Sequence, residues 1–296
     1  MLAWRLIIGS VLVTALVALV WWDAAVEPAG SVLFGCALLL AVACAGELLS
    51  MWSGKPACPP RAVVIGGVLL TVGAAGIPLV LEGTPAWHVG PIGWPLVGLT
   101  IGLLLAVVVQ LSAYRTPGHA AESLALSMLA IVYIGVSLSW MIYLRQVISP
   151  EWGLFALLSM IAVVKMSDTG AYFVGRMIGR HKFAPRISPG KTWEGVAGGI
   201  VTAVLTSCLL FTWVGPAFSL NDVGRGGGAA WVAYGVLLAV AGLIGDLAES
   251  LLKRDSGHKD SSTWLPGMGG VLDILDSLLL ASPVAYLCWI SRMVGP

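Results

Sequence analysis

The residues whose types and spacing could perform chemistry gather in one stretch of this chain, residues 245–277. The stretch carries five Asp, one Glu, three Lys or Arg and one His, although only 10% of the whole chain is charged. A charged side chain at the centre of a bilayer costs about 2.5–3.5 kcal/mol, so an apolar chain retains such a cluster only where water, a counter-charge or a metal compensates it. This stretch is therefore the first candidate for an active site.

Two sets of carboxylates flank a polar loop within the stretch. Asp246, Glu249 and Lys253 fall at i, i+3 and i+7, which places them on one helix face. Asp273 and Asp276 are three residues apart and share a face at the start of the next helix. Carboxylates beside Lys and Arg are typical of a Mg²⁺ site that holds phosphates, because Mg²⁺ takes one or two carboxylates and leaves its other positions to water and phosphate.

A second polar run lies inside an apolar segment. Lys165, Asp168 and Tyr172 again fall at i, i+3 and i+7 on one helix face. One interpretation is a structural ion pair between Lys165 and Asp168 that neutralises itself. The other is that both side chains belong to the active site.

The basic loop 176–191 follows this segment. Ser188, Lys191 and Thr192 come at the N-terminus of the next helix and predict a phosphate-binding cradle, since they combine donors, a cation and the positive end of the helix dipole. A P-loop is excluded, because Pro185 stands where that motif needs glycine and a membrane span stands where it needs a strand. For the other basic residues of the loop, the tendency of cytoplasmic loops to be positive is an equal explanation.

The composition predicts an all-α polytopic membrane protein. The chain has 296 residues, is 58% hydrophobic and has a mean hydropathy of +0.93, outside the range of soluble domains. About twenty apolar residues cross a bilayer as a helix. We count nine such runs: 6–20, 32–51, 63–81, 94–113, 124–143, 152–174, 195–214, 231–252 and 278–293.

The distribution of Lys and Arg predicts the orientation of these nine helices. With the N-terminus in the cytoplasm and the C-terminus outside, twelve basic residues lie in cytoplasmic segments and three in outer ones. A secretory signal peptide is the alternative for 6–20, although Trp21, Trp22 and Asp23 make a poor cleavage context. Because polar residues inside the spans concentrate after Trp152, we predict an N-terminal scaffold domain, 1–150, and a catalytic domain, 151–296. The five cysteines show no metal-binding or disulfide pattern.

Three motifs of the second half resemble those of the phosphatidate cytidylyltransferase, or CDP-diacylglycerol synthase, family. The long signature reads Ser250-x₂-Lys253-Arg254-x₄-Lys259-Asp260, then Pro266-Gly267-x-Gly269-Gly270-x₂-Asp273-x₂-Asp276-Ser277. The others are the run from Lys165 to Phe173 before Gly175-Arg176, and Ser188-Pro189-x-Lys191-Thr192-x-Glu194-Gly195. Two positions depart from the signature, since the family usually has His where this chain has Met268 and Arg where it has Ile274.

The resemblance implies a membrane nucleotidyltransferase that joins CTP to phosphatidic acid, giving CDP-diacylglycerol and pyrophosphate. We assign catalysis to Asp246, Asp273, Lys253 and Asp168, and metal binding to Asp246, Asp273, Asp276 and Glu249. Substrate binding is assigned to Ser188, Lys191, Thr192, Arg254, Lys259, His258 and Lys165. Which loop binds the nucleotide and which binds the lipid phosphate, the one with Ser188 or the one with Lys259, is left open. The expected cofactor is Mg²⁺, and a second, monovalent cation and a homodimer are left open. The expected partners are CTP, phosphatidic acid and the lipid bilayer, and no nucleic acid is expected. The expected location is a bacterial inner membrane, with the active site facing the cytoplasm.

Three alternatives remain at this stage. An ion-coupled membrane transporter is the first, since charged residues within spans mark ion paths, although here they cluster at one membrane face. A CDP-alcohol phosphatidyltransferase is the second, but its expected Asp-Gly-x-x-Ala-Arg opening is absent. A divergent or inactive relative is the third, suggested by Met268 and Ile274.

Overall fold

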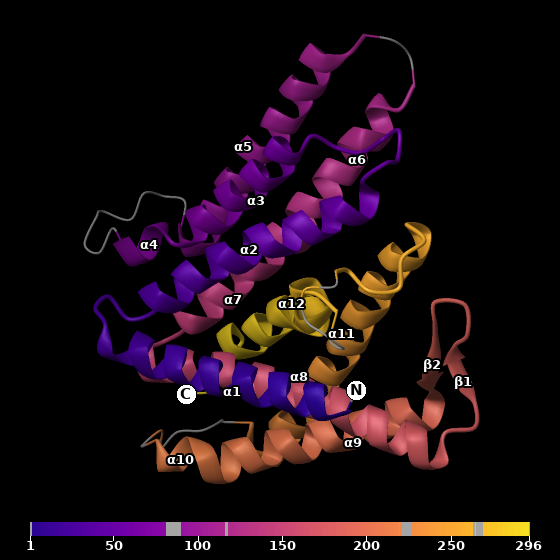
Figure 1. The fold of residues 1–296 in the computed structure, drawn as a ribbon. Coiled ribbons are helices and arrows are strands. Elements are labelled where there is room, and N and C mark those ends of the chain that lie inside the picture. Colours follow the sequence, from indigo (N-terminus) through magenta and orange to yellow (C-terminus); the bar gives the residue numbers. More distant parts are fainter. Residues whose placement is uncertain are drawn as a thin grey trace. The chain divides into compact units, whose positions relative to one another are not determined.

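The chain folds into helices of membrane-spanning length (Figure 1). The computed structural model describes residues 2–80, 90–115, 118–218, 220, 226–262, 264 and 269–295. Within these residues, nine helices are long and apolar enough to cross a membrane, in agreement with the nine predicted spans. The predicted fold class is confirmed, and the chain is a multi-pass integral membrane protein.

The first half of the chain contributes five of these spans within the described residues. Its elements are α1 (Leu2–Ala25), α2 (Ser31–Trp52), α3 (Arg61–Ala75), α4 (Ile77–Val80), α5 (Gly90–Ala113), α6 (Ala120–Ala130), the π-helical turn η1 (Ile131–Val136) and α7 (Ser137–Arg145). The last three are continuous and form a single span with a π-helical segment in its middle.

The second half contributes the remaining spans of the described residues and a short hairpin. Its elements are α8 (Pro150–Ile178), β1 (Lys182–Ala184), β2 (Ser188–Thr192), α9 (Trp193–Leu209), the π-helical turn η2 (Leu210–Val214), α10 (Gly215–Ala217), α11 (Gly227–Asp255) and α12 (Val271–Ile290). The last helix begins at Val271, seven residues before the predicted run 278–293, so Asp273 and Asp276 lie within its first two turns.

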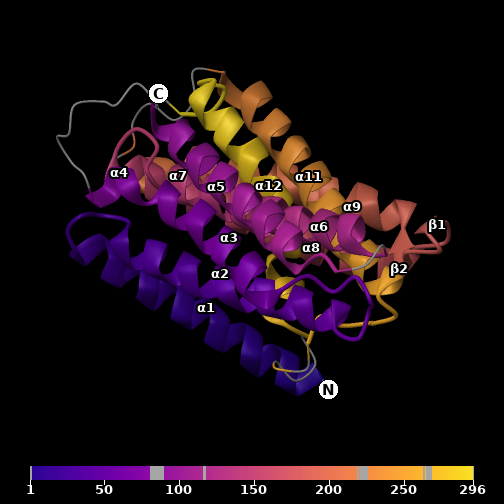
Figure 2. The same cartoon turned by 90° about the horizontal axis from the view of Figure 1, so that it is seen from above.

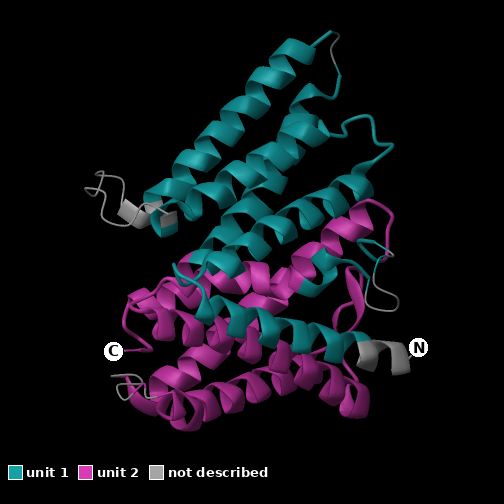
Figure 3. Cartoon of the chain, turned by 60° about the vertical axis from the view of Figure 1, so that its left-hand side comes forward, with its two compact units in different colours: residues 1–142, 260–274 teal, residues 143–259, 275–296 magenta. Residues whose placement is uncertain are grey.

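The helices form two compact units (Figure 3). Unit 1 comprises residues 1–142 and 260–274, and unit 2 comprises residues 143–259 and 275–296. The loop after α11 from Asp260 onward and the first turn of α12 thus belong to the unit built from the N-terminal half. The predicted division into 1–150 and 151–296 stays a prediction.

In unit 1, helix α3 packs against both α2 and α5 (Figure 2). Val64, Val68 and Val72 recur along one face of α3 and are fully buried. The fully buried Asp23, at the end of α1, accepts hydrogen bonds from the backbone N–H groups of Val32 at 3.1 Å and Leu33 at 3.0 Å. Its carboxylate therefore caps the first turn of α2, whose amides have no partner within the helix.

In unit 2, helix α8 packs along α9 and also contacts α11. A Cβ atom at Gly199 of α9 would lie only 3.0 Å from the backbone oxygen of Ser167 on α8, so a glycine permits this close approach. At the other end of the helices, Phe155, Phe211 and Trp289 form edge or tilted ring contacts at 5.5–6.1 Å. Such pairs add about 0.5–1.5 kcal/mol each beyond burial, and they hold α12 against α8 and η2.

The loop that follows α8 is an antiparallel hairpin, which the sequence did not predict. Lys182 pairs with Thr192 and Ala184 with Ser188. β1 is only three residues long and β2 contains Pro189 and Gly190, so neither strand shows the alternation that marks a strand. Thr192 ends β2 and caps α9, because its hydroxyl accepts a hydrogen bond from the Gly195 N–H at 3.1 Å.

Candidate active site

An ion pair between the hairpin and α11 lies at the centre of the candidate site in unit 2. Lys191 Nζ of β2 lies 2.8 Å from Asp246 Oδ2 of α11. Both side chains are more than half buried, with 18% and 34% exposure. The Ser250 hydroxyl, one helical turn further along α11, donates to Asp246 Oδ1 at 3.3 Å. Thus two residues predicted for different roles, phosphate binding and metal binding, meet directly.

A second polar network joins α8 to α12 in the same unit. Lys165 Nζ lies 3.5 Å from Asp168 Oδ2 and donates to the Ser277 hydroxyl at 2.9 Å. That hydroxyl donates in turn to Asp168 Oδ2 at 3.1 Å, and the Ser277 N–H donates to Asp276 Oδ1 at 2.5 Å. Asp246 lies close enough to Asp168 and Asp276 for the three carboxylate charges to interact. The spacing of Lys165 and Asp168 thus predicted a real contact.

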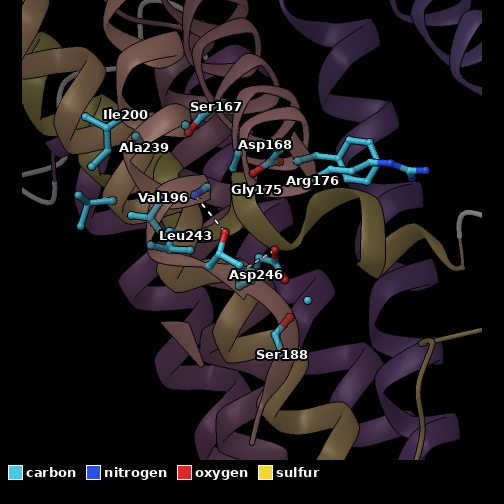
Figure 4. A pocket seen from close by; sticks show the side chains of 18 residues that line it. Ser167, Asp168, Gly175, Arg176, Ser188, Val196, Ile200, Ala239, Leu243 and Asp246 are labelled. Carbon is cyan, nitrogen blue, oxygen red and sulfur yellow. Dashed lines mark hydrogen bonds and ion pairs between the residues drawn. The ribbon is translucent and has the colours of Figure 1, made fainter. Parts of the chain in front are cut away.

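A cavity of about 460 Å³ is lined by Lys191 and Asp246 of the ion pair and by Asp168 of the second network (Figure 4). Elements α8, β2, α9 and α11 line it. Its polar lining residues are Ser167, Asp168, Tyr172, Arg176, Ser188, Lys191, Thr192 and Asp246. Its apolar lining residues include Ala171, Val196, Ile200, Ala239, Val240 and Leu243.

The carboxylates and several of the aliphatic side chains lie toward different sides of the cavity. In Figure 4, Asp168, Asp246 and Ser188 lie toward one side. Val196, Ile200 and Ala239 lie toward the other. A ligand that fills this cavity therefore meets charges at one end and aliphatic side chains at the other.

The remaining charged residues of α11 and its following loop are placed differently. Glu249 is fully buried and forms an ion pair with Lys253, so the pair neutralises itself within one helix face. Arg254 donates from Nε to the backbone oxygen of Ile187 at 3.3 Å, which ties the end of α11 to the hairpin. His258 and Lys259 are exposed. Their assignment to the substrate stays a prediction.

Asp273 belongs to unit 1 and is held by several donors. Its Oδ2 accepts hydrogen bonds from the Gly270 N–H at 2.7 Å, the Ser261 N–H at 2.9 Å and the Ser261 hydroxyl at 2.6 Å. The carboxylate thus caps its own helix, α12, and fixes the loop before it. Pro266, Gly267 and Met268 of the signature lie outside the described residues.

Among the described residues, no group of three or more His, Cys, Asp or Glu side chains is arranged to hold a metal. A Mg²⁺ ion that also binds substrate phosphates needs only one or two protein carboxylates. Asp246, with its neighbours Asp168 and Asp276, offers oxygen ligands of the required kind.

Sequence reasoning missed three residues of these networks. Ser277 was part of the signature but received no role, and it links Lys165 to Asp168.

Glu194 accepts hydrogen bonds from the Arg180 and His181 N–H groups and lies 2.6 Å from His181 Nδ1, so it holds the hairpin to α9. Glu47, on α2, bonds to the start of α12. Glu47 stood out in the sequence as an acidic residue within an early span, but nothing in the sequence indicated its partner.

Comparison with known proteins defines the class of this protein. The Cytidylyltransferase family matches residues 3–291, nearly the whole chain. The chain therefore belongs to the Cytidylyltransferase family. This membership does not support the transporter and CDP-alcohol phosphatidyltransferase alternatives.

Individual relatives carry more particular names. The chain is 31% identical over 276 residues to the phosphatidate cytidylyltransferase of Staphylococcus aureus (strain COL), covering 92% of this chain and 95% of that protein. It is 47% identical over 135 residues to the phosphatidate cytidylyltransferase of Haemophilus influenzae, covering 45% of each. It is also 34% identical over 148 residues to the uncharacterized protein YnbB of Escherichia coli, covering 50% of this chain and 46% of that protein. The matches to the last two proteins thus span about half of their length.

Proposed function

We propose that this protein is a phosphatidate cytidylyltransferase, which transfers the cytidylyl group of CTP to phosphatidic acid and releases pyrophosphate. Family membership and the names of the relatives support the reaction class. The observation that carries the proposal is the Lys191–Asp246 pair at the polar side of a cavity whose other side is aliphatic.

The cavity suits a lipid with a charged head. The aliphatic side chains of Val196, Ile200 and Leu243 can pack against an acyl chain, so the chain can leave the bilayer without entering water. A phosphate monoester needs cations and N–H or O–H donors, which Lys191, Arg176 and Ser188 can provide. Phosphatidic acid has both parts, and CTP has only the second.

The reaction is a displacement at phosphorus. A phosphate oxygen of phosphatidic acid attacks the α-phosphorus of CTP, an O–P bond forms, and the bond from that phosphorus to the pyrophosphate oxygen breaks. The attacking group is already an anion, so a strong general base is not required. The main barrier is repulsion between two polyanions, and positioned cations such as Lys191 and Lys165 lower it.

Mg²⁺ is the proposed cofactor, because the charged residues supply carboxylate oxygens beside basic groups. When bound, it would neutralise the phosphates and hold them in line. We propose Asp246 and Asp273 as its first ligands on the basis of charge and signature, followed by Asp276. Glu249 is the last of the predicted ligands, because its carboxylate is fully buried and paired with Lys253 of the same helix, whereas the Asp246 side chain is partly exposed. The second, monovalent cation stays a prediction.

We propose that the catalytic motifs face the cytoplasm of a bacterium, in the inner membrane. The twelve-to-three distribution of basic residues supports this orientation, with the N-terminus inside and the C-terminus outside. CTP is made in the cytoplasm, so a cytoplasmic site gives the soluble substrate direct access.

The substrates can be tested with purified protein in detergent. Phosphatidic acid labelled in an acyl chain should give labelled CDP-diacylglycerol and one pyrophosphate for each product, and both should need CTP and Mg²⁺. Omission of the lipid should stop pyrophosphate release, which separates transfer from simple CTP hydrolysis. Pyrophosphate release without labelled lipid product would contradict the proposal.

A further inference from the structure

The buried carboxylate of Glu47 joins the N-terminal half of the chain to the catalytic signature within unit 1. Glu47 lies in the membrane span α2 and is 7% exposed. Its Oε1 accepts a hydrogen bond from the Val271 N–H at 2.9 Å, and its Oε2 accepts from the Leu272 N–H at 2.8 Å. These are the first two amides of α12, so Glu47 caps this helix from a different one.

The Ser261 hydroxyl links Glu47 to Asp273. It lies 2.9 Å from Glu47 Oε2 and 2.6 Å from Asp273 Oδ2. A hydroxyl has one proton to donate, so the two carboxylates share a single donor. A change at Glu47 therefore alters the hydrogen bonding of Asp273 directly.

The two glycines of the signature make room for this arrangement. A Cβ atom at Gly270 would collide with the Glu47 carboxylate and with the Ser261 hydroxyl. A Cβ atom at Gly269 would collide with the Asp273 carboxylate, and the backbone of Gly269 has φ of +87°. The Gly-Gly pair is thus required by the two carboxylates that approach the loop.

From these contacts we infer that Glu47 is a positioning residue, which fixes Asp273 through Ser261 and through the first turn of α12. The inference rests on the proposed function, in which Asp273 is a metal ligand. Glu47 itself has no assigned contact with substrate. It acts by restricting where the Asp273 carboxylate can point.

The first test compares Glu47→Gln with Asp23→Asn. Both carboxylates are buried and cap the first amides of a span, but Asp23 accepts its hydrogen bonds from Val32 and Leu33 of α2, which lie outside the signature. Glu47→Gln turns one acceptor oxygen into an NH₂ group that faces an N–H or O–H donor. It should raise the Mg²⁺ concentration for half-maximal activity about 10–100-fold, as loss of residues that orient metal ligands does. Asp23→Asn should lower the melting temperature without moving this Mg²⁺ requirement.

The second test needs no activity. Thermal unfolding of Glu47→Gln, Asp273→Asn and the double variant forms a double-mutant cycle, and we expect non-additive losses because both carboxylates bond to Ser261. The cycle of Asp23→Asn with Asp273→Asn should be additive. Ser261→Ala, which leaves the two backbone bonds of Glu47 in place, should also raise the Mg²⁺ requirement.

These outcomes separate the inference from the proposed function. Additive losses in the Glu47–Asp273 cycle, or an unchanged Mg²⁺ requirement in both Glu47→Gln and Ser261→Ala, would overturn the inference. A wild-type protein that makes no CDP-diacylglycerol would instead refute the proposed function, and the stability cycle would still decide whether Glu47 and Asp273 are coupled.

Discussion

Lys191 and Asp246 face each other across the polar side of the cavity, with Nζ and Oδ2 2.8 Å apart. The hairpin supplies the cation and α11 supplies the carboxylate. A phosphate that binds Lys191 competes with Asp246 for the ammonium group, and it thereby leaves the carboxylate available to a metal ion. We therefore expect the pair to link phosphate binding to metal binding.

Lys191→Ala should weaken substrate use while the protein stays folded. Loss of a cation that faces developing phosphate charge should lower kcat/KM by about 10²–10³-fold. Steady-state kinetics and the melting temperature of detergent-purified protein measure the two effects. Lys182→Ala is the matched control, because Lys182 is exposed on the other strand and does not line the cavity. Unchanged kinetics in Lys191→Ala would show that this lysine binds no phosphate.

Asp246→Asn and Asp273→Asn should each abolish turnover, because the amide keeps the shape of the side chain but loses the charge that binds a hard cation. Any residual kcat should be no lower in the double variant than in the single variants, since each ligand is of little use without the metal that the other helps to hold. Asp255→Asn, exposed at the end of α11, is the control and should be mild. If the fold-decrease in kcat of the double variant equals the product of the two single fold-decreases, a shared metal is ruled out.

Glu194→Ala should loosen the hairpin. Glu194 accepts hydrogen bonds from the Arg180 and His181 N–H groups at 3.1 and 3.2 Å and contacts the His181 ring, so its loss frees the chain that leads into β1. Hydrogen exchange of residues 180–192 should become faster, and KM should rise. The exposed His119–Glu122 pair, with 3.0 Å between Nδ1 and Oε2, offers Glu122→Ala as a control that leaves both quantities unchanged. Wild-type exchange rates in Glu194→Ala would refute the role of this carboxylate.

Parts of this arrangement could be predicted from the sequence because they depend on one helix at a time. Hydrophobic runs gave the nine spans of the described chain, and i, i+3 spacing gave the contact of Lys165 with Asp168. The link from Ser277 to Lys165 depends on how α12 packs against α8, and periodicity within a helix carries no information about that. The partner of Glu47 was hidden for the same reason.

The hairpin illustrates a different limit. Its strands, KFA and SPGKT, contain neither alternation nor a run of β-branched residues, and their pairing arises because α8 and α9 bring the two ends of the loop together. Thr192 was predicted to bind phosphate through its hydroxyl. In the structure the oxygen of that hydroxyl accepts a hydrogen bond from the Gly195 N–H and so caps α9. Thr192 could therefore bind a phosphate only while its hydroxyl also caps the helix.

The orientation of the protein predicts opposite labelling of two exposed positions. In a variant without the five native cysteines, Pro185→Cys at the turn of the hairpin should react with an impermeant reagent only after the membrane is broken. Ser291→Cys, beyond α12, should react in intact cells. The reverse pattern would contradict the proposed cytoplasmic site, and equal access of both positions would contradict the three spans that lie between them.

The most direct test of the central claim is the rate of CDP-diacylglycerol formation from CTP and phosphatidic acid by the purified wild-type protein, with Asp246→Asn measured in parallel. The account predicts Mg²⁺-dependent turnover by the wild type, with Met268 and Ile274 unchanged, and none by Asp246→Asn. An inactive wild type that gains activity through Met268→His with Ile274→Arg would show that the natural protein lacks the proposed activity. Turnover by Asp246→Asn at the wild-type rate would contradict the metal site, and the Lys191–Asp246 pair would then be structural.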